Sequence, residues 1–344
     1  AEEIVIADHG MTIEDVKGLD YDDPAWNDLL EQLSVEDMVT LISTGGYATA
    51  ELESIGKNTG MDQDGPQGIN SLISGDVKGV VFPSEVVVAS TFNKEVAQKM
   101  GEALGDEAAE YGITGLYGPA MNTHRSPFGG RNYEYYSEDG VLAGKTAAAF
   151  VRGANEAGIY RYMKHFAMDE QETERLDISI WCNEQAMREI YFKPFELCVK
   201  EGGVTAAMAS DSFIGGTWAG LRDELMNTVL RDEWGFDGMV ITDFVTSDSK
   251  DADRMIRSGT DLSLTTLGNL TPTELSTDTA AGRQALRTAS HNILYTFINS
   301  DAQEIAREAF PTWTLLFVGL DIFMLAATAL VMFYRKKPGI EISE

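Results

Sequence analysis

Residues 238–244 read Gly-Met-Val-Ile-Thr-Asp-Phe, an apolar run that ends in one carboxylate, Asp243. The same pattern occurs three times upstream, where an apolar run carries or is followed by ionisable or polar side chains: Gly115–Ala120 before Asn122, Arg161–Ala167 with Lys164 and His165, and Thr205–Ser210 before Asp211. Short apolar runs of this kind predict buried strands. In an α/β barrel the loops after the strands share one mouth, so we expect these side chains to converge there.

Helical patterns alternate with these runs along most of the chain. We expect helices at Ala25–Ile42 and at 94–111, 140–157, 184–201, 222–234, 248–258 and 280–299, and further strands at Gly79–Phe82 and Thr260–Leu264. This alternation predicts a parallel sheet, either open or closed. An open-sheet nucleotide fold would need a Gly-rich phosphate loop, and neither GxGxxG nor GxxxxGK[ST] occurs. The prediction is therefore an α/β fold, a (β/α)8 TIM-like barrel, with one C-terminal transmembrane helix.

The amino-acid composition limits the classes of molecule that this protein can bind. Of 344 residues, 55 are Asp or Glu and only 26 are Lys or Arg, so the net charge is −29. A nucleic-acid binder needs a basic surface, so that class is excluded. The two cysteines, Cys182 and Cys198, form no CxxC pair and join no histidine cluster, so no metal or other cofactor is expected.

The C-terminal end differs in kind from the rest. Trp313–Tyr334 carries a single charge, Asp321, and at about 1.5 Å per residue it would extend roughly 33 Å as a helix. Aromatic residues bracket it, and the basic trio 335–337 follows at once. The pattern predicts a single-pass helix in contact with membrane lipid, with the basic tail in the cytoplasm and the acidic domain outside.

Several motifs stand in a fixed order along the chain. They are DGPQG at 64–68, GPAMNTHRSPFGGRNYEYY at 118–136, KHFA at 164–167, EQAMREIY at 184–191, LRDEWGF at 230–236, GMVITDF at 238–244 and GTDL at 259–262. Together they resemble the catalytic barrel domain of glycoside hydrolase family 3, the β-glucosidase family, over about residues 25–300. The resemblance implies a hydrolase that acts on glycosidic bonds.

The resemblance also implies roles for particular residues. Asp243 matches the family's catalytic nucleophile, a carboxylate that traps the sugar covalently with retention of configuration. Among the substrate-binding residues, Arg131, Lys164 and His165 match donors to sugar hydroxyls, and Asp64 matches an acceptor. Asp211 completes the predicted substrate-binding set; it stands where the family has an aromatic residue beside the nucleophile.

The chain departs from the family pattern at the site. Asn70 replaces an arginine, and Asp169 replaces the asparagine that usually follows the KHFA motif. Asp169 and Asp211 would both add negative charge beside Asp243. Retaining hydrolysis also needs an acid/base carboxyl group about 5 to 5.5 Å from the nucleophile. In most of the family a separate α/β sandwich domain supplies it, so we expect it to come from a domain absent from this chain.

These expectations combine into one prediction with an alternative. The chain is a β-glucosidase-like retaining hydrolase of the cell membrane that cleaves terminal β-linked sugars from a small glucoside or oligosaccharide. The alternative is a catalytically impaired, membrane-tethered carbohydrate-binding barrel. The predicted parts are an N-terminal junction at 1–24, a barrel at 25–300, a linker at 301–312, a membrane helix at 313–334 and a cytoplasmic tail at 335–344.

Overall fold

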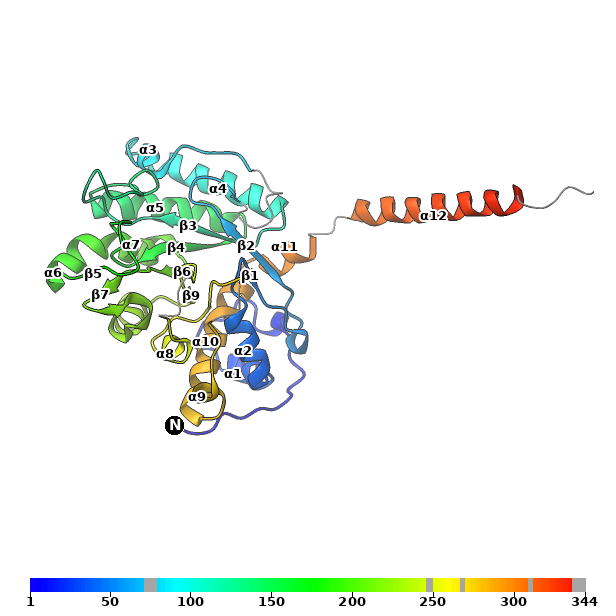
Figure 1. Cartoon of the computed structure of the whole chain (residues 1–344), viewed down its shortest axis with the longest axis horizontal. Helices are drawn as coiled ribbons and strands as arrows, with labels where there is room; N and C mark the ends of the chain where they lie inside the picture. The colour runs from blue at the N-terminus through cyan, green and yellow to red at the C-terminus, as the bar shows by residue number, and fades with distance from the viewer. Residues whose placement is uncertain (71–78, 246–249, 267–269, 309–311, 336–344) are drawn as a thin grey trace, which may run out of the picture. The chain divides into compact units, whose positions relative to one another are not determined.

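The computed structural model describes residues 1–70, 79–245, 250–266, 270–308 and 312–335. It divides into two compact units, Ala1–Ala306 and Arg307–Glu344. The larger unit contains a six-stranded sheet and most of the helices, as Figure 1 shows. The predicted domain bounds stay a prediction.

The six-stranded sheet has the order β1–β2–β3–β4–β6–β9. Its strands are β1 (Ala48–Thr49), β2 (Gly60–Asp64), β3 (Gly115–Ala120), β4 (Tyr160–Phe166), β6 (Ala206–Ala209) and β9 (Met239–Ile241). Only β1 and β2 pair antiparallel, and the other neighbours are parallel. Every residue of β3, β4, β6 and β9 is buried, as continuous apolar strands of a covered parallel sheet should be.

The prediction of a closed eight-stranded barrel is wrong in its closure. In the described part of the chain the sheet is a curled half-barrel with β1 at one edge and β9 at the other. Thr260–Leu264, expected as a strand, contributes one parallel bridge from Leu262 to Ile241. Gly79–Phe82, also expected as a strand, is an extended rim segment whose Val80 and Val81 are exposed. Both segments are too irregular to extend the ladder.

Helices cover the sheet and follow the predicted positions closely. The bounds are α1 (Ala25–Glu31), α2 (Val35–Ser43), α3 (Glu85–Ala89), α4 (Lys94–Glu110), α5 (Gly140–Glu156), α6 (Glu184–Ala186), α7 (Lys193–Gly202), α8 (Ala252–Arg257), α9 (Glu274–Thr277), α10 (Ala280–Ile298) and α11 (Ala302–Glu308). The predicted helices 184–201 and 222–234 include wider π-type turns at Met187–Tyr191 and Glu224–Glu233. α5 packs against α4 and α7, and α10 packs against α2 and β9 (Figure 1).

The helix predicted at Ala25–Ile42 is two helices. Ser34 caps the second one, because its hydroxyl accepts a hydrogen bond from Asp37 N at 3.0 Å, and the Asp37 carboxylate accepts one from Ser34 N at 3.0 Å. This reciprocal capping box starts α2 afresh. The helical spacing of the apolar residues continues across the break between α1 and α2, so the sequence pattern did not reveal that the helix is interrupted.

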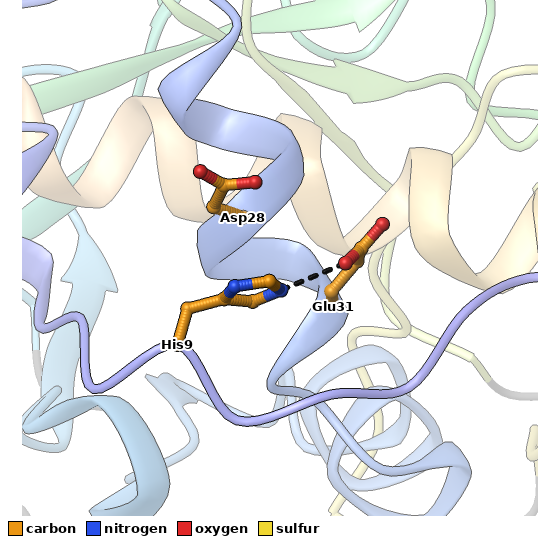
Figure 2. Close-up of side chains that lie close together, drawn as sticks. All are labelled: His9, Asp28 and Glu31. Carbon is orange, nitrogen blue, oxygen red and sulfur yellow. Dashed lines mark hydrogen bonds and ion pairs between the residues drawn. The ribbon is translucent and has the colours of Figure 1, made fainter.

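The N-terminal segment before α1 lies against that helix. Ala7 N donates to the carbonyl oxygen of Glu31 at 2.8 Å, and His9 Nε2 lies 2.8 Å from Glu31 Oε2. Figure 2 shows His9 and the carboxylates of Asp28 and Glu31 grouped at this contact. His9 and Asp28 are exposed, so this group is a surface contact that joins the N-terminal segment to α1.

The smaller unit contains α12 (Thr312–Arg335), a helix where the sequence predicts a membrane span. Among the residues that the structure describes, no helix is long and apolar enough to cross a membrane. The transmembrane assignment of Trp313–Tyr334 is therefore not supported.

The contact between α4 and α5 depends on two glycines. A Cβ atom at Gly153 would lie 2.1 Å from the carbonyl oxygen of Gln98, and one at Gly101 would lie 2.0 Å from that of Phe150. We expect Gly153→Ala to lower the free energy of unfolding by about 1–3 kcal/mol, because the two backbones must move apart. Urea unfolding measures this loss. A Cβ at Gly319 meets nothing within 4 Å, so Gly319→Ala is the control; equal stability of both variants would contradict the account.

Candidate active site

The carboxyl ends of the parallel strands meet at one pocket of about 860 Å³. Five of the six predicted site residues line it, namely Asp64, Arg131, Lys164, His165 and Asp243. Asp64 ends β2, Lys164 and His165 lie in β4, and Asp243 follows β9. The strand-end pattern therefore identified a real cluster, and the same edge of the sheet explains the convergence.

The backbone around Asp243 is held from both sides. Asp243 N donates to the carbonyl oxygen of Ala209 at 3.1 Å, and Thr242 N donates to that of Leu262 at 2.9 Å. The first bond continues the β6–β9 ladder past the strand, and the second continues the bridge between Ile241 and Leu262, so the backbone is held on both sides. The Asp243 side chain is thereby aimed into the pocket from a rigid support.

The two carboxylate oxygens of Asp243 differ in environment. Oδ1 accepts a hydrogen bond from Phe244 N at 2.7 Å. Oδ2 is buried and has no hydrogen-bond partner in the part of the chain that the structure describes. The nearest donors are His165 Nε2 at 3.8 Å and Arg175 Nη1 at 4.0 Å. The carboxylate is therefore fixed through Oδ1, and the lone pairs of Oδ2 accept no hydrogen bond from the described residues.

His165 is fixed by its own backbone. Its N–H donates to Asn122 Oδ1 at 2.8 Å, and Asn122 Nδ2 donates to its carbonyl oxygen at 3.0 Å. Burial, reinforced by Arg131 and Lys164, lowers the pKa of His165 well below its usual value. The imidazole is therefore neutral and can exchange hydrogen bonds with a sugar hydroxyl.

Arg131 is surrounded by carboxylates. It pairs with Glu134, and its Nη1 lies 3.7 Å from Asp169 Oδ2 and 3.5 Å from Glu172 Oε1. Asp169 also lies 3.4 Å from His165 Nδ1, on the side away from Asp243. Burial raises the pKa of Asp169 to about 7, although Arg131 opposes the shift. Asp169 stands where the resemblance implies an asparagine, and because this carboxyl group is buried its ionisation is unfavourable.

Asp64 and Lys164 form the opposite wall. Lys164 Nζ lies 4.0 Å from Asp64 Oδ1, and the Tyr47 hydroxyl donates to Asp64 Oδ2 at 3.2 Å. Burial raises the pKa of Asp64, and the positive charge of Lys164 opposes the shift. A separation of 4.0 Å is loose for a salt bridge, so both groups retain hydrogen-bonding capacity for hydroxyls.

Asp211 is the exception among the predicted site residues. It does not line the pocket; its Oδ1 accepts from Lys250 Nζ at 2.6 Å, and its Oδ2 lies 3.5 Å from Arg175 Nη2. Burial and the neighbouring Asp243 raise the pKa of Asp211, and Lys250 opposes the shift. The structure thus gives no support to a direct substrate contact by Asp211, because this carboxylate is held by two cations.

Sequence reasoning missed these two cations. Arg175 lies in the acidic loop 168–177, and it reaches Glu172, Asp211 and Asp243. Lys250 donates to Asp211 and lies 3.4 Å from the Asp243 carbonyl oxygen. A lone basic residue within an acidic loop was the available signal, since a buried carboxylate cluster needs compensating charge.

Among the residues that the structure describes, no carboxyl group beside Asp243 stands out as an acid/base. Three described carboxylates share the pocket with it, and each lies in an ion-pair contact: Asp64 with Lys164, Glu134 with Arg131, and Glu172 with Arg131 and Arg175. Of the other carboxylates in the loop 168–177, Asp169 faces His165 and Glu170 lines a second cavity. Among the described residues that line the pocket, Asp243 is thus the carboxylate without an ion-pair contact to Lys164 or Arg131.

A metal ion does not fit this pocket well. His165, Asp169 and Asp243 offer ligand atoms within 4.8 Å of one another, the spacing that a cation site would need. However, Asp169 already faces the guanidinium of Arg131, and Asp243 faces that of Arg175. These two carboxylates therefore already have positively charged partners and do not depend on a divalent cation for charge compensation.

Comparisons with known proteins show which family this chain is similar to. Residues 49–278 match the family described as the glycosyl hydrolase family 3 N terminal domain. A β-glucosidase of Rhizobium radiobacter is 37% identical over 242 residues, which cover 69% of this chain and 29% of the relative. An exo-α-(1→6)-L-arabinopyranosidase of Bifidobacterium longum is 36% identical over 225 residues, covering 62% of this chain and 30% of that protein.

Solved structures show the same likeness. β-Glucosidase 3B of Thermotoga neapolitana in complex with glucose matches with a TM-score of 0.74 and 31% identity, over 84% of this chain and 44% of that one. The chain thus spans less than half the length of these relatives.

The pKa of Asp169 yields a test by stability. In the unfolded chain an aspartate has a pKa near 3.9, whereas burial raises that of Asp169 to about 7. Folding therefore becomes less favourable as the pH rises from about 4 to 7, because the folded state must ionise a dry carboxyl group. Asp169→Asn should be more stable than the unchanged chain at pH 8, with the difference shrinking toward pH 4.

Urea unfolding at several pH values measures this difference. Arg131 keeps Glu134 and Glu172 as partners in the variant, so it is not left unpaired. The exposed Glu138 provides the matched control, because Glu138→Gln removes one surface charge without touching the pocket. A stability difference that is independent of pH, or an unchanged chain that is more stable at pH 8, would contradict the assignment.

Proposed function

Since the chain belongs to glycosyl hydrolase family 3, we propose that its pocket carries the nucleophile of a β-glucosidase-like retaining hydrolase. The observation that carries the proposal is Oδ2 of Asp243, which is buried at the pocket without a hydrogen-bond partner among the described residues. This oxygen attacks the anomeric carbon, and the bond to the leaving oxygen breaks. Water then releases the sugar from the covalent glycosyl–Asp243 intermediate.

Charge around Asp243 favours this role. Arg175 and Lys250 neutralise the neighbouring Asp211, and Arg175 also lies 4.0 Å from Asp243 Oδ2. The negative charge of Asp211 is one of the features, with Asp169, Asn70 and the missing acid/base, that support the alternative of an impaired, carbohydrate-binding barrel. With that charge compensated, hydrolysis is the better account.

The proposed substrate is a small β-linked glucoside or related oligosaccharide. Arg131, Lys164 and His165 would donate hydrogen bonds to its hydroxyls, and Asp64 would accept them. The support is the lining of the pocket together with the names of the relatives, which include β-glucosidases and an arabinopyranosidase. Asn70 also lines the pocket, where the family has an arginine, so one charged contact to the sugar is replaced by a neutral one.

The acid/base is proposed to come from a part of the protein outside this sequence. The chain matches only 29% of the length of the Rhizobium relative, and each described carboxylate that shares the pocket with Asp243 is in contact with a cation. Aryl glucosides with good leaving groups need little acid assistance, so the chain alone should act on them far better than on cellobiose.

A place at the cell membrane, with the sugar-binding pocket outside, remains a proposal that rests on the sequence. The described side chains of α12 expose large apolar groups, such as Leu316, Phe323 and Leu325. Exposed apolar surface of this extent is typical of a lipid or protein contact.

Replacing Asp243 tests the function. Asp243→Asn keeps the shape of the side chain and removes the nucleophile, so hydrolysis of an aryl β-glucoside should fall by at least about 10³-fold. The rate of aryl release measures it. Asp251→Asn is the control, because Asp251 caps α8 outside the pocket and should leave the rate within about twofold. If Asp243→Asn hydrolyses the aryl β-glucoside at a rate near that of the unchanged chain, Asp243 is not the nucleophile.

Fractionation tests the location. The 344-residue chain should sediment with membranes, whereas a chain ending at residue 310 should remain in the supernatant, because the apolar helix is gone. Detergent should release the first from the pellet, and 1 M salt should not. The whole chain staying in the supernatant without detergent would contradict the proposal.

A further inference from the structure

A second cavity of about 470 Å³ lies beside the active-site pocket. It is formed by the loop after β3, the loop after β4 and the short strand β5 (Ser179–Ile180), and its lining is Arg125, Ser126, Phe128, Gly129, Glu170, Gln171, Thr173, Ile178 and Ile180. None of these residues lines the pocket of Asp243. The hydrolysis proposed above makes no use of them.

One thin wall separates the two cavities. Glu172 N donates to the carbonyl oxygen of Gly129 at 3.0 Å, which joins the two loops. The approach needs a glycine, because a Cβ at Gly129 would lie 3.0 Å from the carbonyl oxygen of Glu170. Along this wall Gly130 and Glu172 face the pocket of Asp243, and Gly129 and Gln171 face the second cavity.

Glu170 gives the second cavity a built polar anchor. Its side chain is 6% exposed, and its Oε1 has no hydrogen-bond partner among the described residues. Burial, with the nearby Asp169, raises the pKa of Glu170 to about 8, against the opposing effects of Asn122 and Arg125. At neutral pH the group is therefore mostly an uncharged carboxyl, able to donate and to accept. A buried polar atom left unpaired is costly, so its presence here points to a ligand.

The rest of the lining fits a sugar. Arg125 lies over the ring of Tyr191 at 5.5 Å and offers guanidinium donors beside Glu170. Phe128 is 89% exposed at the edge of the cavity, and Trp181, next to the lining residue Ile180, is 81% exposed. Flat apolar faces beside hydroxyl, amide and carboxyl groups match a pyranose ring, which has an apolar face and a polar rim.

We propose that this cavity is a second carbohydrate-binding site, which takes a neutral mono- or disaccharide. Glu170 and Arg125 bind hydroxyls, and Phe128 stacks on the sugar face. An apolar ligand is disfavoured by the polar lining. The site lies on the other side of the wall that carries Arg131 and Glu172, so it can hold a sugar chain close to the place of cleavage without taking part in it.

Binding, not turnover, tests this inference. The probe is cellobiose, titrated by ligand-observed NMR into the full chain carrying Asp64→Ala and Asp243→Asn. These changes disable sugar binding and cleavage in the first pocket, so the binding that remains reports the second site. We expect a millimolar dissociation constant in this background.

Variants of the second site identify it. Phe128→Ala and Glu170→Ala should each weaken cellobiose binding at least about fivefold, because each removes a direct contact. Glu170→Gln keeps a donor and an acceptor and should stay within about twofold. Tyr111→Ala, an exposed aromatic residue that lines neither cavity, should change nothing.

Two results would overturn the inference: no cellobiose binding in the disabled background, or binding that is unaffected by Phe128→Ala and Glu170→Ala. The outcome is independent of the proposed hydrolysis. If Asp243→Asn alone leaves hydrolysis intact, the nucleophile is wrong, but binding in the second cavity is still measured by its own variants.

Discussion

The site depends on the balance of charge around one buried carboxylate. Asp243 is aimed into a pocket whose surroundings already hold several carboxylates: Asp64, Glu134, Asp169, Glu172 and Asp211. Such a cluster is stable only if cations lie among its members. Arg131, Lys164, Arg175 and Lys250 supply them, and every one contacts at least one carboxylate of the group. The arrangement leaves Oδ2 of Asp243 without a hydrogen-bond partner among the described residues, while its neighbours are neutralised.

The loop after β4 organises this balance. Asp169, Glu170, Glu172 and Arg175 lie within a few residues of one another, yet they face three different environments. Asp169 supports His165, Glu172 and Arg175 complete the first pocket, and Glu170 belongs to the second cavity. The bond from Glu172 N to the Gly129 carbonyl oxygen holds this loop against the loop that carries Arg131. One loop therefore shapes both cavities.

Much of this arrangement could be predicted from the sequence, because the pattern of apolar residues indicates where the strands end. The runs at Gly115–Ala120 and Gly238–Thr242 became β3 and β9, and the side chains after the strands met at one pocket. The closed barrel was not realised, because Thr260–Leu264 contributes a single bridge and β1 pairs antiparallel. The pairing of Asp211 with Lys250 depends on how loops fold back across the mouth, and no periodic pattern encodes that. The membrane span was predicted from the length of the apolar run, its flanking aromatic residues and the basic trio 335–337, and the described part of α12 gives it no support.

Trapping the covalent intermediate tests the central claim most directly. A 2-deoxy-2-fluoro glucoside with a good leaving group slows breakdown of the glycosyl–enzyme, so the labelled peptide can be identified by mass spectrometry. The account predicts one added fluoroglucosyl group on the peptide that contains Asp243, and none after Asp243→Asn. A label on the peptide that contains Asp211 or Glu172, or the same labelling in the Asp243→Asn chain, would contradict it.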